Sequence, residues 1–372
     1  MVTASPVFFL VKDFVQTEEA TAAFFAISVS VSSVAIVAAN FAGGFLADRV
    51  GRKRVIACGS AILAPSLFSY TLAPNILWVV TLYFVQMFGI NLFQPAFTAF
   101  VADLSKVSSR GKAFGRYNSF WIGSTVPAPL VGGYLADSFG LRFPFALASL
   151  FALIALVTSF ALIEITHKPA TPENAKVEHD SQNVLMPFAS VMLIFGLISL
   201  FNGMLNGMIS PLIRIYTVFK LGGSATELGL IFSLGSGLVT TLIQIPGGRL
   251  TDKMGRKPLM LISLLGVPLL IAMAYTSSIF QFILASAGLV AFGNLGAPAY
   301  SAWLMDLVSD RKRARASGLT NAMSGVGMFI GPQLSTWIYQ SQPIVALAFI
   351  ATAVPWILQA PFILKLKETK PA

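Results

Sequence analysis

The sequence GGFLADRVGRKR occupies residues 43–54, and the similar sequence GGRLTDKMGRKP occupies residues 247–258, about half the chain later. Each copy is a polar, strongly basic turn between two long uncharged segments, and Asp48 of the first copy corresponds to Asp252 of the second. A basic turn that recurs between apolar segments in both halves of a chain indicates a membrane protein with an internal duplication.

The composition is too apolar for a soluble protein. Of the 372 residues, 56% are hydrophobic and 11% are charged, whereas a soluble domain has about 25% charged residues. Asp, Glu, Lys and Arg are absent from residues 20–47, 55–102, 117–136, 143–163, 184–213, 228–248, 258–305 and 316–364. A membrane-spanning helix needs about 20 apolar residues, and the three longest stretches are broken at Pro74-Asn75, Ser277-Ser278 and Ser341-Gln342-Pro343. We therefore predict an all-α polytopic membrane protein with about 11 complete spans and a partial first span.

The distribution of positive charge predicts the orientation in the membrane. The net charge is +10, and all Lys and Arg residues except Lys12, Arg142, Arg214 and Lys220 fall on the side of the two basic turns. Positive residues concentrate in cytoplasmic loops, so we expect these turns and both termini to be cytoplasmic and the protein to be in the inner, cytoplasmic membrane. This pattern argues against nucleic acid as a partner.

The polar stretch Glu164–Asn183 divides the chain. It contains prolines and mixed charges, as a flexible linker does, so we predict a six-helix bundle at 1–163, a cytoplasmic linker at 164–183 and a second six-helix bundle at 184–372. The first span is short relative to its counterpart in the second half, which suggests a late start codon or a truncated chain. The single cysteine, Cys58, is in an apolar segment and both histidines are in the linker. We therefore expect no metal, no cofactor and no enzymatic activity.

A second repeated pattern follows the fourth and tenth spans. Residues 95–115 read PAFTAFVADLSKVSSRGKAFG, and residues 298–318 read PAYSAWLMDLVSDRKRARASG. Together with the paired basic turns and the two sets of six spans, these motifs make the whole chain resemble the major facilitator superfamily. The resemblance implies two six-helix bundles around a central pathway, a solute site near mid-membrane and alternating access by rocking of the halves.

In that family the residues of the basic turns form a cytoplasmic latch in one access state, because an aspartate faces a helix N-terminus and the basic residues pair with acids at neighbouring span ends. The two glycines before each turn allow a close approach to a neighbouring helix. The matching residues here are Gly43, Gly44, Asp48, Arg49, Gly51, Arg52, Lys53, Asp103 and Arg110 in the first half, and Gly248, Asp252, Gly255, Arg256, Asp306 and Arg313 in the second. The same charges would also serve to set topology.

The solute-binding candidates are polar residues within the spans. They are Asn91, Gln94, Asn118, Trp121, Asn202, Asn206, Arg214, Gln244, Asn294 and Asn321. Hydrogen bonds between helices are the alternative role for the amides. Asn202 and Asn206 are four residues apart and share one helix face. Arg214 either binds an anionic group or, as we favour from the sequence, extends to the outer headgroups.

These features predict the general function but not the identity of the solute. We predict a secondary transporter of a small organic solute, acting as a monomer in the lipid bilayer. Export is favoured because residues 124–133 partly match a motif of drug antiporters, although the arginine that these antiporters carry in the fourth span is replaced by Val85. The alternatives are a sugar or organic-anion uptake permease and a non-transporting relative. Proton coupling is left open, because no acidic residue lies in the middle of a span.

Overall fold

The computed structural model describes residues 3, 5–104, 120, 123–161, 187–308, 313–341, 345–366 and 368, in which every regular element is a helix. The first half contains α1 (Pro6–Val15), α2 (Glu18–Val50), α3 (Arg52–Ser69), η1 (Tyr70–Leu72), α4 (Ile76–Leu104), α6 (Pro127–Phe139) and α7 (Phe143–Phe160). The second half contains α8 (Phe188–Ile215), η4 (Tyr216–Lys220), α9 (Ala225–Leu230), η5 (Ile231–Leu238), α10 (Val239–Met254), α11 (Arg256–Ser263), α12 (Gly266–Met273), α13 (Ile279–Leu307), α14 (Arg313–Ser341), α15 (Val345–Ile357) and α16 (Ala360–Lys365).

The helices have the lengths that a bilayer requires. In the described ranges nine candidate spans are long and apolar enough to cross a membrane. They are Glu18–Ala47, Arg52–Leu72, Ile76–Thr98, Phe143–Phe160, Phe188–Lys220, Ala225–Ile243, Arg256–Met273, Ile279–Leu307 and Val345–Lys365. The helices α6 and α14 pack alongside these spans, and α1 is a short helix of 10 residues. The predicted all-α architecture is confirmed in the residues that the structure describes.

A glycine at each basic turn ends one helix and starts the next. Gly51 has a φ of 101° between α2 and α3, and Gly255 has a φ of 92° between α10 and α11. Residues with a Cβ rarely adopt such positive φ values. The chain therefore reverses direction within a single residue, and Arg52 and Arg256 become the first residues of the following helices.

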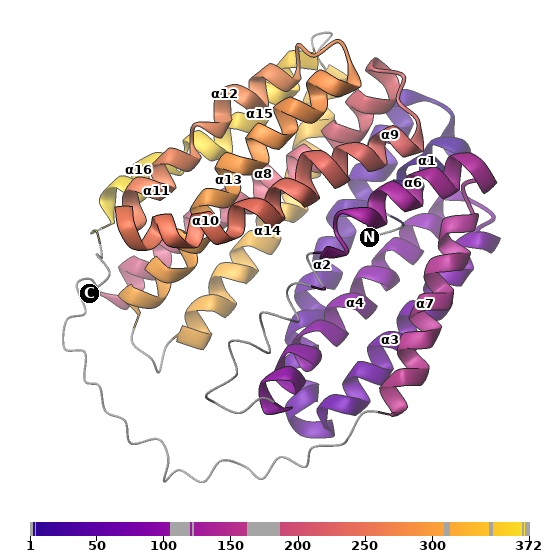
Figure 1. The fold of residues 1–372 in the computed structure, drawn as a ribbon, viewed down its shortest axis with the longest axis horizontal. Helices are drawn as coiled ribbons and strands as arrows, with labels where there is room; N and C mark the ends of the chain where they lie inside the picture. Colours follow the sequence, from indigo (N-terminus) through magenta and orange to yellow (C-terminus); the bar gives the residue numbers. More distant parts are fainter. Residues whose placement is uncertain are drawn as a thin grey trace.

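Within each half, the helices pack against one another (Figure 1). In the first half α4 contacts α2 and α3, and α3 also contacts α7. In the second half α8 packs against α14 through small residues. A Cβ at Gly331 would lie 2.5 Å from the carbonyl oxygen of Met204, and a Cβ at Gly207 would lie 2.9 Å from the Pro332 ring. These two helices therefore touch almost backbone to backbone, as glycine-rich membrane helices do.

The two halves meet at the end of the molecule away from the basic turns (Figure 1). Here the start of α2 contacts the end of α14. The Tyr339 hydroxyl donates a hydrogen bond to the carboxylate of Glu18, and the amide of Gln340 donates to the backbone carbonyl of Glu19 at 2.7 Å. Further along α2, Val37 lies against Gly325 of α14.

A second contact between the halves joins α6 to α9. The carboxylate of Asp137 accepts hydrogen bonds from the backbone N–H groups of Thr226 at 2.7 Å and Ala225 at 3.2 Å. A carboxylate is favourable at this position because the first N–H groups of a helix carry partial positive charge. One turn further, a Cβ at Gly229 would lie 2.5 Å from the carbonyl oxygen of Pro129. The halves are thus tightly closed at this end.

Candidate functional site

The candidate site is a cavity of about 670 Å³ inside the second half. Residues of α8, η5, α10, α13 and α14 form most of its wall, and Met260 and Ser263 of α11, Trp356 of α15 and Gln359 complete it. A volume of this size fits a small organic molecule, since typical ligand pockets occupy about 300–1,000 Å³.

One wall is a polar stripe on α8. Asn202, Asn206, Ser210 and Arg214 follow one another at intervals of four residues, and all four line the cavity. Residues four apart lie on the same helix face, so a single helix presents two amides, a hydroxyl and a guanidinium to the same space. Asn206 donates a hydrogen bond from its Nδ2 to the backbone carbonyl of Asn202 at 2.8 Å, which leaves its amide oxygen available.

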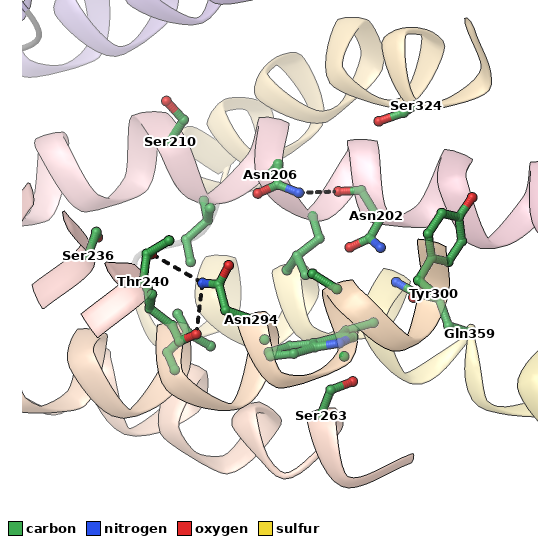
Figure 2. A pocket seen from close by; sticks show the side chains of 18 of the residues that line it. Asn202, Asn206, Ser210, Ser236, Thr240, Ser263, Asn294, Tyr300, Ser324 and Gln359 are labelled. Atoms are coloured by element: carbon green, nitrogen blue, oxygen red, sulfur yellow. Dashed lines mark hydrogen bonds between the residues drawn. The ribbon is translucent and has the colours of Figure 1, made fainter. Parts of the chain in front are cut away.

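The opposite wall also carries amide and hydroxyl groups (Figure 2). Asn294 of α13 donates from Nδ2 to the hydroxyl of Thr240 at 3.3 Å and to the backbone carbonyl of Val290 at 3.0 Å. In the same region the hydroxyls of Ser199 and Tyr300 are 2.5 Å apart. These bonds hold the side chains in fixed orientations, and the amide oxygen of Asn294 remains as an acceptor.

Electrostatically the cavity is one-sided. Arg214 is the only charged residue in its lining, and no Asp or Glu lines it in the part of the chain that the structure describes. The other polar lining residues are Ser199, Asn202, Asn206, Ser210, Ser236, Thr240, Ser263, Ser286, Asn294, Tyr300, Ser301, Thr320, Asn321, Ser324 and Gln359. The wall therefore offers many neutral hydrogen-bond groups and one cation.

The favoured sequence interpretation of Arg214 is wrong: the side chain does not extend to the headgroups. Only 8% of the residue is exposed. Its guanidinium carbon lies 4.9 Å from the ring centre of Phe25 on α2 and 4.5 Å from that of Phe232 on η5. Nη1 donates to the backbone carbonyl of Ser210 at 2.7 Å and to its hydroxyl at 2.9 Å. The helix continues past Arg214 into η4, so this candidate span reaches Lys220 and Arg214 is not its last residue.

The other solute-binding candidates divide into three groups. The first group lines the cavity described above and consists of Asn202, Asn206, Arg214, Asn294 and Asn321. Asn91 and Gln94 are on α4 in the first half and do not line it; Asn91 instead accepts a hydrogen bond from Asn40 at 3.3 Å and donates to the Met87 carbonyl. Asn118 and Trp121, together with the side chain of Gln244, lie outside the described residues.

The first basic turn is described in part. A Cβ at Gly43 would lie 2.9 Å from the ring of Pro95, whereas Gly44 faces open space. The close approach to α4 therefore concerns Gly43 alone. Arg49 is exposed and its guanidinium carbon lies 4.2 Å from the ring centre of Phe45.

Other residues of the first latch cannot be placed in full. The side chains of Asp48 and Asp103, and the whole of Arg110, lie outside the described residues. Arg52 begins α3, and Lys53 is half-buried next to it. The predicted latch between this turn and the fourth span stays a prediction.

The second basic turn is held by two acids. Arg256, 8% exposed, places its Nε 3.2 Å from a carboxylate oxygen of Asp306 on α13. The carboxylate of Glu368, near the chain end, accepts the backbone N–H groups of Arg256 at 2.7 Å and Lys257 at 3.0 Å. Gly248 faces open space. The side chains of Asp252 and Arg313 are outside the described residues.

Sequence reasoning missed several of these residues. Ser210, Thr240 and Gln359 line the cavity, but serine, threonine and glutamine occur throughout the spans and carry no signal of their own. The stripe on α8 was visible in principle, because its polar residues repeat every four positions up to Arg214. Glu368 had no signal, since its role depends on the chain end folding back onto α11.

Comparison with known proteins identifies the family. The model of the Major Facilitator Superfamily matches residues 2–199 and again residues 195–372. Among curated proteins, the chain is similar to multidrug resistance protein 2 of Bacillus subtilis (26% identity, covering 80% of this chain and 75% of that protein). It is also similar to multidrug resistance protein MdtG of Dickeya zeae (27% identity, 84% and 77%).

Among solved structures, the D-xylose-proton symporter superposes with a TM-score of 0.77 at 16% identity, covering 98% of this chain and 96% of that one. At this identity the likeness establishes the fold. The family model matches both halves of the chain in turn, in agreement with the paired basic turns and the helical architecture. The chain belongs to the Major Facilitator Superfamily.

Proposed function

We propose that this protein is a secondary transporter that exports a small polar organic solute through alternating access, with the second-half cavity as the solute site. The observation that carries the proposal is the cavity itself, which combines a suitable volume with facing walls of amides and hydroxyls. A few well-placed polar groups in an otherwise apolar bundle are what fixes a solute in such proteins.

The contacts between the halves support alternating access. Glu18 with Tyr339, and Asp137 with the start of α9, close the end away from the basic turns. Both contacts join one half to the other, so rocking of the halves would have to break them. In this proposal the side of the basic turns is cytoplasmic, as the concentration of positive residues there supports. The structure then corresponds to the state in which the solute site is sealed from the outer side.

The direction of transport rests on the relatives, whose names describe multidrug resistance. An uptake permease for sugars or organic anions is the second candidate. The hydroxyl-rich lining and the absence of an acid among the described lining residues favour it over transport of organic cations. Coupling to protons is compatible with either direction, and we leave the coupling ion open.

The test is solute exchange in proteoliposomes that contain the purified protein. Exchange of labelled for unlabelled solute reports transport whatever the direction or the coupling. We expect a protein-dependent exchange of small polar solutes that Asn206→Trp, which fills the cavity, reduces at least about tenfold. The matched control is Leu193→Trp on the same helix, because Leu193 is 65% exposed and does not line the cavity.

Two further outcomes decide the details. Equal exchange by the Asn206→Trp and Leu193→Trp proteins would show that the solute does not pass through this cavity. Inverted vesicles with an imposed pH gradient then separate export from uptake: accumulation inside inverted vesicles means export from the cell, and its loss when the gradient is dissipated means proton coupling.

A further inference from the structure

Arg214 occupies the closed end of the cavity. It is near the end of α8, one turn beyond Ser210, and it lines the cavity next to Phe232. The cavity thus ends in a guanidinium at the side where α2 and η5 seal it. Any solute that enters from the basic-turn side and moves to the bottom of the cavity meets this group.

The guanidinium has unused hydrogen-bond donors. The described contacts of Nη1 are with the carbonyl and hydroxyl of Ser210, which are neutral acceptors. Nε is buried and has no hydrogen-bond partner. A guanidinium carries five N–H donors in a rigid fork that matches a carboxylate or phosphate. The edge that includes Nε therefore has an unpaired donor and the donor geometry that a carboxylate or phosphate requires.

The charge has no counter-ion among the residues that the structure describes. Among the described residues no carboxylate pairs with Arg214. The rings of Phe25 and Phe232 stabilise a cation but do not neutralise it. A buried cation inside a membrane protein is costly and is usually retained for function.

We propose that Arg214 is the anchor for an anionic group of the solute, so that the substrate class is a small organic anion such as a carboxylate. The amides and hydroxyls of the α8 stripe would then bind the neutral part of the same molecule. This inference rests on the proposed function, since it assigns the solute of the same cavity.

A purely structural role is the competing explanation. Phe25 belongs to the first half and Phe232 to the second, so Arg214 could serve only to join the halves through its two ring contacts. A structural arginine would make the protein less stable when replaced, but it would not make wild-type protein prefer anions. The experiment therefore begins with the wild type.

The experiment measures how each ligand changes the melting temperature of the purified full chain. Unfolding is monitored by tryptophan fluorescence. The probes are matched pairs: lactate with lactamide, benzoate with benzamide, and gluconate with glucose, all at the same sodium concentration. We expect the anion of at least one pair to stabilise the wild type more than its uncharged partner does. No anion preference in any pair would overturn the proposal.

Variants then locate the preference. Arg214→Gln should weaken anion binding roughly tenfold or more, which corresponds to the loss of a charge-assisted hydrogen bond, while leaving the uncharged partners unaffected. Arg214→Lys keeps the positive charge but loses the forked donor geometry of the guanidinium, so part of the preference for anions should remain. This variant also tests the proposal if Arg214→Gln does not fold. The matched control is Lys220→Gln, which removes an exposed cation six residues further along the chain. An anion preference that persists in Arg214→Gln, or that Lys220→Gln removes equally, would overturn the assignment.

Failure of this inference is distinguishable from failure of the proposed function. Protein-dependent exchange of glucose without any preference for anions would refute the anion anchor and leave a transporter of neutral solutes. Binding of carboxylates that depends on Arg214, with no exchange in proteoliposomes, would support the anchor and refute transport.

Discussion

The glycine contact between α6 and α9 offers the sharpest test of alternating access. A Cβ at Gly229 would lie 2.5 Å from the carbonyl oxygen of Pro129, 3.0 Å from its carbonyl carbon and 3.1 Å from the Cα of Leu130. All three atoms are backbone, so no side chain can rotate away. Gly229→Ala must therefore push the two halves apart at the closed end.

The magnitude follows from this overlap. Overpacking by one methyl group costs about 1–3 kcal/mol, and the cost applies only to the state in which α6 and α9 touch. The equilibrium between the two access states should shift toward opening at this end by about 5–150-fold. The control is Gly318→Ala on α14, because a Cβ there meets nothing within 4 Å. Both variants gain the same helix propensity, about 1 kcal/mol, so this gain cancels in the comparison.

The assay uses one reporter cysteine in the cavity. Cys58 is exposed and is first replaced by serine, and Ser301, an exposed cavity residue, is replaced by cysteine. A membrane-impermeant maleimide is added to right-side-out or inverted vesicles, and the ratio of the two labelling rates reports the ratio of the two states. We expect Gly229→Ala to change this ratio at least about fivefold. A ratio equal to that of Gly318→Ala, at equal amounts of folded protein, would refute the reasoning.

Three further predictions concern the turns and the cavity. Arg256→Gln should lower the free energy of unfolding by about 1 kcal/mol, since it breaks the partly exposed pair with Asp306; a melting curve that matches the wild type would contradict this. Asp48→Asn should reduce solute exchange while normal amounts of folded protein reach the membrane, and unchanged exchange would argue that the first turn serves topology alone. Asn294→Ala removes an amide that is hydrogen-bonded to Thr240. In the exchange assay it should weaken solute affinity about 5–10-fold, whereas the control Asn91→Ala should leave the affinity unchanged.

The architecture was predictable because the bilayer constrains it strongly. Backbone groups in lipid must bond within the helix, so uncharged stretches of sufficient length and the breaks at Pro74 and Ser277 correspond closely to helices and their ends. The glycines of the basic turns were equally readable. Gly51 and Gly255 have the positive φ values that a one-residue reversal needs.

The candidate site was predictable only in part. Asn202 and Asn206 were identified as sharing a face, and both line the cavity with Asn294 and Asn321. Asn91 has the same amide in a similar apolar setting, but it bonds to Asn40 in the first half. The rotation of each helix about its axis decides which of these amides reaches the cavity, and that rotation depends on the neighbours against which the helix packs.

The sequence by itself determined the duplication, the helical class, the approximate spans and the family, because hydrophobic length and the recurring basic turns are local properties of the chain. Only the tertiary structure decided the role of Arg214. Its position near a span end is compatible with a side chain in the headgroups, but α8 continues into η4 and Phe25 of the other half covers the guanidinium. Burial of a charge depends on what packs around it, and here one of the two covering rings, Phe25, comes from about 190 positions earlier in the chain.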